Sequence, residues 1–505
     1  MSDKKSTNLG ADATLLTFSK VATSAIAMVM AMLLSRFRTL EEYGTYSQIL
    51  MVVNLVTSIL MLGLPKSLNY FLAKTDSKEE KQKFLSLYYT LNTLLSFIVG
   101  LALVLGVGLI EKYFENPTIR SFLYFLAIFP WTKIICSSIE NLLIVYKKPK
   151  ALVIFRIANS LALLLTVLVV QWLGMTFKDY MLLYVLVEAI FSVAVYIIAI
   201  RVSGGLKFHF SAKMLRTVLA FSVPLGLASV VGTLNVELDK LLIGFLMDTE
   251  SFAIYTNAAR ELPVTMIASS FTAVLLPQMV RMLRRDENRA AVKLWGNATT
   301  LSMILIAVIG VGCFVYAEDV IKILYSEKYI EGVWVFRLYS LHLLLRCTYY
   351  GMVLNSIGKT SFIFWCSIGA LCSNAALNIL LFKAFELFGQ SMLAPAVATL
   401  ISTTAMAILQ LAVTAKSLEM RFREIFPWKE SAIILLVNIA FGAVFWAVKE
   451  IIPLDRAFSG IMISDKTLDG GVIESVILGC VWGIAYFGVM FKTIKKKWRN
   501  LKVKD

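Results

Sequence analysis

Five positively charged side chains lie inside long apolar stretches of the chain, where a charge is unfavourable. They are Lys20, Lys133, Arg156, Arg260 and Arg346. A charged group at the centre of a membrane span costs roughly 2.5 to 3.5 kcal/mol, so it normally faces protein or a wet cavity. Lysine and arginine bind phosphate oxygens through strong charge-assisted hydrogen bonds. These five residues therefore predict a cationic wall suited to an anionic solute.

Polar side chains share helical faces with three of these cations. The groups are Lys133, Ser137 and Glu140; Arg156 and Asn159; and His342 and Arg346. Residues three, four or seven apart lie on one face of a helix, so each group forms a stripe that can line a cavity. A structural alternative stays open, in which cations pair with acids only to hold helices together. The pairs would be Lys133 with Glu140, or Arg260 with Glu188 or Glu237.

Carboxylates in the apolar stretches are candidates for ion coupling. Glu140, Glu188 and Glu261 could each take a proton or a sodium ion, because a low-dielectric site strains the charged state of a carboxyl group. Asp239 and Lys240 are adjacent near the end of their stretch, which is typical of a solvated interface pair.

Motifs for other chemistries are not found in the sequence. The segment from Gly351 to Thr360 ends in Gly-Lys-Thr, but six residues separate its two glycines where a phosphate-binding loop requires four. The two histidines, His209 and His342, and the six cysteines form no zinc or catalytic pattern. We predict no metal, no cofactor and no enzymatic activity.

The stretches that carry these residues are predicted to be transmembrane helices. The chain is 58% hydrophobic and 16% charged, whereas a soluble domain is about 25% charged. We count about 14 stretches near the ~20 residues that span a bilayer. They run over 11–34, 43–64, 84–110, 122–145, 151–173, 180–200, 218–245, 252–276, 298–316, 333–354, 362–381, 392–413, 431–447 and 471–491. The expected fold is an all-α polytopic membrane protein.

The basic residues predict the orientation of these spans. Most of the 49 lysines and arginines fall in alternate joints, including 66–83, 147–150, 281–293 and the tail from residue 492. Lysine and arginine concentrate on the cytoplasmic side of membrane proteins, so both termini should be cytoplasmic. The net charge of +16 then reflects topology, and nucleic acid is not an expected partner.

Part of the chain repeats. Residues 33–65 and 242–277 each contain the end of one span, a short turn and the next span up to a proline. A parallel repeat predicts two lobes related by an axis along the membrane normal. The expected parts are an N-terminal lobe over 1–203, a second lobe over 204–416, and two further spans with a basic tail over 417–505.

Several of these segments look familiar as a set. Leu-Leu-Ser-Arg from Leu33, Glu-Tyr-Gly-Thr-Tyr from Glu42, the Gly-Leu-Pro exit at Pro65, Gly-Lys at Gly358 and the small-residue span from Gly389 resemble the bacterial oligosaccharide and polysaccharide flippases. This is the Wzx-like branch of the MOP superfamily. The resemblance covers essentially the whole chain.

The resemblance implies a MATE-like V of two six-helix lobes plus two C-terminal helices. It also implies translocation of an undecaprenyl-diphosphate-linked oligosaccharide from the cytoplasmic to the outer leaflet, by alternating access through a cationic central cavity. In the related lipid II flippases, cavity cations come from the first, second and eighth spans. Lys20 and Arg260 match the first and eighth, whereas the second offers Asn54 and no cation. The expected substrate-binding set is Lys20, Arg260, Lys133, Arg156, Arg346 and Asn54.

Two other functions compete with this expectation. A multidrug exporter of the same superfamily would favour an acidic cavity for cationic cargo, and a membrane glycosyltransferase or polymerase would need long outer loops for its catalytic residues. The expected partners are a lipid-linked oligosaccharide with an anionic diphosphate, membrane lipids, and a polysaccharide polymerase with glycosyltransferases. The expected location is the bacterial cytoplasmic membrane.

Overall fold

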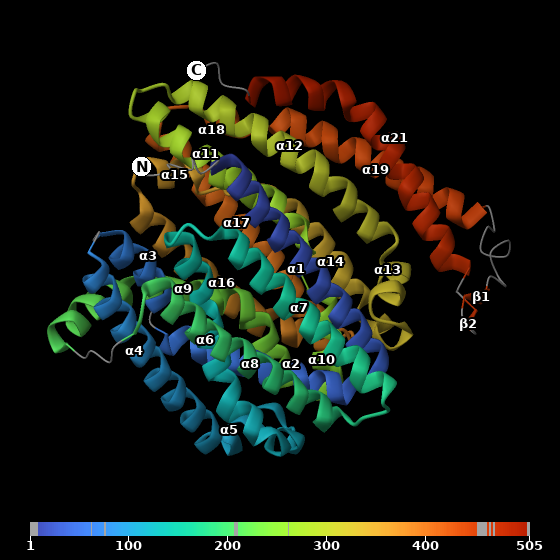
Figure 1. The fold of residues 1–505 in the computed structure, drawn as a ribbon. Helices are drawn as coiled ribbons and strands as arrows, with labels where there is room; N and C mark the ends of the chain where they lie inside the picture. The colour runs from blue at the N-terminus through green and yellow to red at the C-terminus, as the bar shows by residue number, and fades with distance from the viewer. Residues whose placement is uncertain are drawn as a thin grey trace. The chain divides into compact units, whose positions relative to one another are not determined.

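The protein is described by a computed structural model over residues 9–61, 63–74, 77–206, 211–260, 262–451, 462–463, 466–467 and 470–501. These residues are almost entirely helical (Figure 1). Within these ranges the one strand pairing is antiparallel, between β1 (Met462–Ile463) and β2 (Lys466–Thr467). The chain divides into two compact units, Met1–Ala253 and Ile254–Asp505, called here unit 1 and unit 2.

Unit 1 contains the helices up to the start of α10. They are α1 (Leu9–Phe37), α2 (Leu40–Leu60), α3 (Leu64–Lys74), α4 (Lys78–Leu105), α5 (Val107–Phe114), η1 (Pro117–Phe122), α6 (Leu123–Val145), α7 (Pro149–Trp172), α8 (Phe177–Ser203) and α9 (Ala212–Leu246). The unit boundary falls within α10 (Thr249–Ala258).

Unit 2 contains the remaining elements. They are η2 (Pro263–Thr265), α11 (Met266–Leu283), α12 (Asn288–Val315), α13 (Ala317–Leu324), η3 (Glu327–Gly332), α14 (Val333–Leu345), α15 (Met352–Ser356), α16 (Thr360–Glu386), α17 (Leu393–Ser417), α18 (Phe422–Ile425), α19 (Trp428–Ile451) and α21 (Gly470–Leu501). The predicted lobe boundary at residue 203 stays a prediction.

The described helices are long and apolar enough for a membrane protein. Twelve of them could cross a bilayer, or thirteen when the two bent halves of α9 are counted as one span. The predicted span over 333–354 is not among them, because α14 ends at Leu345 and α15 has only 5 residues. The break between them is held from α12, where Trp295 Nε1 donates to Thr348 Oγ1 at 3.0 Å.

A repeat of element lengths follows directly after the segments 33–65 and 242–277 in which the sequence predicts one. The elements α4, α5 and η1 have 28, 8 and 6 residues, and α12, α13 and η3 have the same lengths in the same order. The two units then diverge. The next helix is α6 in unit 1, which continues for 23 residues, whereas its counterpart α14 stops after 13. In the same way α2 runs for 21 residues, whereas α10 stops after 10 and is followed by η2.

A tight contact within unit 1 joins the α2–α3 turn to a bend in α9. The two halves of α9, up to Pro224 and from Ser229, are inclined by 46°. Gly63 has φ +71°, and a Cβ placed on it would lie 2.6 Å from both the Gly226 nitrogen and the Ser222 carbonyl oxygen. Only glycine adopts this backbone conformation easily, and only glycine fits the space.

Changing Gly63 to alanine is expected to lower the thermal unfolding midpoint clearly, because the Cβ collides with backbone that cannot rotate away. Gly174 is the matched control, since its φ is +63° and no atom lies within 4 Å of its hypothetical Cβ. Gly174→Ala should therefore show only the left-handed backbone strain of about 1 to 2 kcal/mol. Equal midpoints for the two variants in detergent would contradict the role given to the α2–α9 contact.

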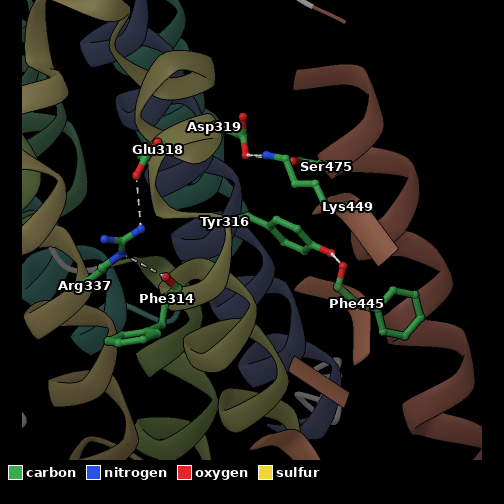
Figure 2. A network of polar contacts seen from close by, with 8 residues as sticks. All are labelled: Phe314, Tyr316, Glu318, Asp319, Arg337, Phe445, Lys449 and Ser475. Atoms are coloured by element: carbon green, nitrogen blue, oxygen red, sulfur yellow. Dashed lines mark hydrogen bonds and ion pairs between the residues drawn. The ribbon is translucent and has the colours of Figure 1, made fainter. Parts of the chain in front are cut away.

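The C-terminal helices α19 and α21 pack against α12 and against each other (Figure 1). Trp482 and Tyr486 of α21 are fully buried there, and the Tyr486 hydroxyl donates to the Ile304 carbonyl oxygen at 3.1 Å. At one end of this contact, Lys449 of α19 forms an ion pair with Asp319 of α13 (Figure 2). The two extra predicted helices are therefore an integral part of unit 2.

Candidate functional site

Three helices of unit 1 bring two predicted cations to one carboxylate. Glu140 of α6 forms ion pairs with Lys20 of α1, at 3.1 Å, and with Arg156 of α7. The helices meet because α7 packs against both α1 and α6. Lys20 remains 54% exposed in this arrangement, whereas Arg156 is 16% exposed. The alternative pairing of Lys133 with Glu140 is wrong, because Glu140 is taken by cations from two other helices.

Lys133 lies among different acids. The carboxylates that act on it electrostatically belong to Glu188 of α8 and Glu237 of α9. Within the described ranges no carboxylate reaches ion-pair distance of Lys133. Glu188 is only 8% exposed and accepts a 3.4 Å hydrogen bond from the Asn159 amide.

Glu237 has its own cation within α9, forming a 2.8 Å ion pair with Lys240. Asp239 is only 3% exposed, and the paired Lys240 and Glu237 are 23% and 13% exposed, so the solvated interface pair expected for Asp239 and Lys240 is wrong. Lys20, Lys133 and Arg156 thus each have an acid nearby, so the part of the predicted cationic wall that lies in unit 1 is partly neutralised.

Unit 2 brings the other two predicted cations into one narrow pocket. Arg260 and Arg346 line it together with Tyr339, Ser340 and His342. Helix α14 presents Tyr339, His342 and Arg346 on one face, because they are spaced i, i+3 and i+7. Arg346 is the residue that ends α14, and Arg260 follows the end of α10. Both arginines therefore sit where unit 2 breaks a helix that continues in unit 1.

Two polar residues that line this pocket, Tyr339 and Ser340, were not singled out from the sequence. Tyr339 contacts the His342 ring with centroids 5.9 Å apart, and its hydroxyl lies 3.3 Å from the Tyr255 hydroxyl. The spacing of Tyr339 to Arg346, i and i+7, is the signal that would have placed it on the same stripe.

Two predicted site residues remain, Asn54 and Glu261. Asn54 is partly buried in α2, and its side-chain oxygen accepts no hydrogen bond from the described residues. Glu261 lies outside the described residues. No group of three metal-ligating side chains comes together in the described part of the chain.

The contribution of the cluster around Glu140 to the free energy of unfolding can be measured. Glu140→Gln leaves Lys20 and Arg156 facing each other without their shared counter-charge, so we expect a loss of about 1 to 3 kcal/mol in unfolding free energy, less than for a fully buried pair. The measurement is thermal unfolding of the purified protein. The double change Glu140→Gln with Arg156→Gln should recover part of the loss, and a double variant less stable than the single would refute mutual neutralisation.

The sequence is similar to proteins of polysaccharide and lipid-linked glycan pathways. A family model described as "Polysaccharide biosynthesis protein" matches residues 33–334. The probable lipid II flippase MurJ of Rickettsia prowazekii (strain Madrid E) is 22% identical over 120 residues, which is 24% of each chain. The probable low-salt glycan biosynthesis flippase Agl15 of Haloferax volcanii is 20% identical over 246 residues, 48% of this chain and 51% of that one. The matched segments thus span a quarter to a half of these relatives' lengths.

Solved structures show the same fold over more of the chain. A lipid II flippase MurJ in an inward closed conformation has a TM-score of 0.69 at 15% identity, covering 95% of this chain and 99% of its own. An inward-facing multidrug resistance MATE family transporter of the MOP superfamily has a TM-score of 0.62 at 12% identity, covering 79% and 94%. The prediction of an all-α polytopic membrane protein is confirmed. Because the family model matches more than half of the sequence, this chain belongs to the polysaccharide biosynthesis protein family.

Proposed function

We propose that this protein moves an undecaprenyl-diphosphate-linked oligosaccharide from the cytoplasmic to the outer leaflet of a bacterial cytoplasmic membrane, with both of its own termini on the cytoplasmic side. The observation that carries the proposal is the family match over residues 33–334. The two relatives that match parts of the chain are both named as flippases, one for lipid II and one for a glycan pathway.

The pocket in unit 2 supplies chemistry that fits such a cargo. A diphosphate carries negative charge that cannot cross ~30 Å of hydrocarbon unaided. Guanidinium groups form bidentate, charge-assisted hydrogen bonds with phosphate oxygens. Arg260 and Arg346 line one pocket of about 10 Å³, which has room for about one water molecule. We assign these two arginines the diphosphate, and the assignment requires the pocket to widen during the transport cycle. In this proposal Lys20, Lys133, Arg156 and Asn54 lie along the path of the substrate, and Glu140, Glu188 and Glu261 are the ion-coupling sites.

The mechanism we propose is alternating access, as expected for a transporter of this family. Glycosyltransferases would build the cargo before translocation, and a polymerase would act on it afterwards. Both are therefore proposed partners. A MATE-type exporter of cationic drugs is the competing function, because a MATE structure shares the fold.

Translocation can be measured in sealed vesicles. The purified protein is reconstituted with a fluorescent undecaprenyl-diphosphate oligosaccharide, and an impermeant glycosidase then cleaves whatever glycan reaches the outside. We expect nearly all of the glycan to become cleavable with the protein and only the outer-leaflet share without it. If the protein leaves the inner-leaflet glycan protected but drives uptake of a cationic dye, the exporter is correct and the flippase is not.

A further inference from the structure

The last helix of the chain is longer than a membrane requires. Helix α21 has 32 residues, about 48 Å at 1.5 Å per residue, whereas the hydrocarbon core is about 30 Å thick. Its final turns therefore extend into the headgroup region or beyond. These turns still pack on unit 2, since Ile494 and Leu501 contact its apolar core and Lys497 forms a 2.9 Å ion pair with Glu430.

The opposite side of these turns is basic and exposed. Lys492, Lys495, Lys496 and Arg499 are spaced i, i+3, i+4 and i+7, so they form one stripe facing away from the packed side. Trp498 beside the stripe is 54% exposed. A tryptophan this exposed, next to lysines at the end of a membrane helix, is the composition found at a membrane–water interface.

A second segment joins the stripe. The short helix α18 and the start of α19 contribute Arg421, Phe422, Arg423, Trp428 and Lys429, all exposed. The segment is fixed from beneath, because Ile425 and Phe426 are buried in unit 2. The ion pair between Lys497 and Glu430 ties it to the end of α21. We name the two segments together the basic-aromatic surface; its members are Lys492, Lys495, Lys496, Trp498, Arg499, Arg421, Phe422, Arg423, Trp428 and Lys429.

This surface has more basic than acidic side chains. Glu424 of α18 is exposed among its members, and Glu430 acts electrostatically on Lys429. Among the residues that the structure describes, none of its seven lysines and arginines forms an ion pair. Glu430 is already bound to Lys497, which is not a member. A solvated basic face would need no aromatic residues, whereas Phe422, Trp428 and Trp498 expose 37%, 40% and 54% of their surfaces here. Basic and aromatic side chains together fit a ligand with an anionic head and an apolar body.

We propose that the basic-aromatic surface binds the headgroups of anionic phospholipids, with its aromatic rings inserted at the level of the glycerol backbone. Clusters of four to eight lysines and arginines next to a membrane helix bind anionic lipid, each contributing roughly a fivefold gain in affinity. Removing three of the charges should therefore weaken the preference for anionic lipid about 100-fold. This binding is separate from the transport of a lipid-linked oligosaccharide and does not depend on it.

The test uses the full-length protein in phosphatidylcholine nanodiscs that contain a small fraction of a brominated probe lipid. The probe is either brominated phosphatidylglycerol or brominated phosphatidylcholine, and both carry bromine near the carboxyl end of their acyl chains. Bromine quenches nearby tryptophan, and the contribution of Trp498 is the difference between the wild type and Trp498→Phe. We expect brominated phosphatidylglycerol to quench Trp498 at a far lower fraction than brominated phosphatidylcholine. The triple variant Lys495→Gln, Lys496→Gln and Arg499→Gln should lose this preference.

A matched control removes the same net charge elsewhere. Lys147 and Lys148 are exposed between α6 and α7, and Lys150 is exposed in the first turn of α7. Their triple change to glutamine should leave the quenching of Trp498 unaltered. Equal quenching by the two lipids in the wild type, or an equal loss in both triple variants, would overturn the proposal. Repeating the titration of the wild type and Trp498→Phe at about 1 M salt, where the screening length falls to ~3 Å, tests the same point without either triple variant. The preference should disappear there, and its persistence would also overturn the proposal.

Discussion

Replacing Arg260 and Arg346 together by glutamine is expected to reduce translocation of the lipid-linked oligosaccharide by at least about 100-fold. Each guanidinium that binds a phosphate oxygen is worth roughly 1.5 to 3 kcal/mol, which is about 10-fold to 100-fold in affinity. Because both arginines line the same pocket, we expect either single change to be harmful and the double change to be the most severe. The vesicle assay with an impermeant glycosidase measures the rate directly.

Arg337 is the matched control for this experiment. It lies on α14 like the pocket residues, but it stacks over the Trp334 ring at 4.5 Å and pairs with Glu318, which is 61% exposed. Arg337→Gln removes one guanidinium without touching the pocket, so transport should stay within a factor of about 2, as for a surface ion pair worth 0 to 1 kcal/mol. A double pocket variant that unfolds like the wild type and still transports at full rate would remove Arg260 and Arg346 from the site.

An effect of Lys20→Gln on transport has two explanations that must be separated. The resemblance to lipid II flippases gives it a substrate contact, but in the structure it is paired with Glu140 at 3.1 Å. Loss of transport in Lys20→Gln could then follow from either loss of contact or a disturbed cluster. Glu140→Gln separates the two, because it frees Lys20 while disturbing the same cluster.

The helical spans and the repeat could be predicted because they depend on local properties. A run of about 20 apolar residues is a span wherever it packs. The repeat was predicted from residues 33–65 and 242–277, and the equal lengths of α4 and α12 and of α5 and α13 extend it. The breaks after α10 and α14 could not be predicted in this way. The residues after Arg346 are apolar enough to continue a helix, and the turn is instead held by Thr348, whose hydroxyl lies 2.9 Å from Thr299 and accepts from Trp295.

The charged residues of the site were predicted by type, whereas their contacts were not. The spacing of Lys133 and Glu140 along one helix suggested an ion pair between them. In a packed bundle, however, a carboxylate can also form ion pairs with cations from neighbouring helices. Glu140 binds Lys20 and Arg156 because α1, α6 and α7 converge on it. That convergence depends on helix packing over the whole of unit 1, which spacing along one helix does not contain.

Changing Lys449 to methionine is expected to lower the unfolding free energy of unit 2 by about 3 kcal/mol, the largest stability effect foreseen here. Its ammonium group is the counter-charge of Asp319, which is only 6% exposed (Figure 2). The Ser475 hydroxyl also donates to Asp319, at 2.8 Å, so one carboxylate joins α13, α19 and α21. Without Lys449, Asp319 is a buried charge with a single hydroxyl donor, and such a group is strongly destabilising.

A double variant tests whether the unpaired charge of Asp319 causes the loss of stability in Lys449→Met. Asp319→Asn with Lys449→Met removes both charges, so it should recover much of the stability, because a neutral amide can still bond to Ser475. Arg337→Gln, in the same region of Figure 2, removes the pair with Glu318, whose side chain is 61% exposed, and the bond to the Phe314 carbonyl oxygen. It should shift the unfolding midpoint less than Lys449→Met. Thermal unfolding combined with limited proteolysis checks both points, since α19 and α21 should become cleavable first if this ion pair secures them. A Lys449 variant as stable and as protease-resistant as Arg337→Gln would show that burial of Trp482 and Tyr486 against α12 is enough to hold the two helices.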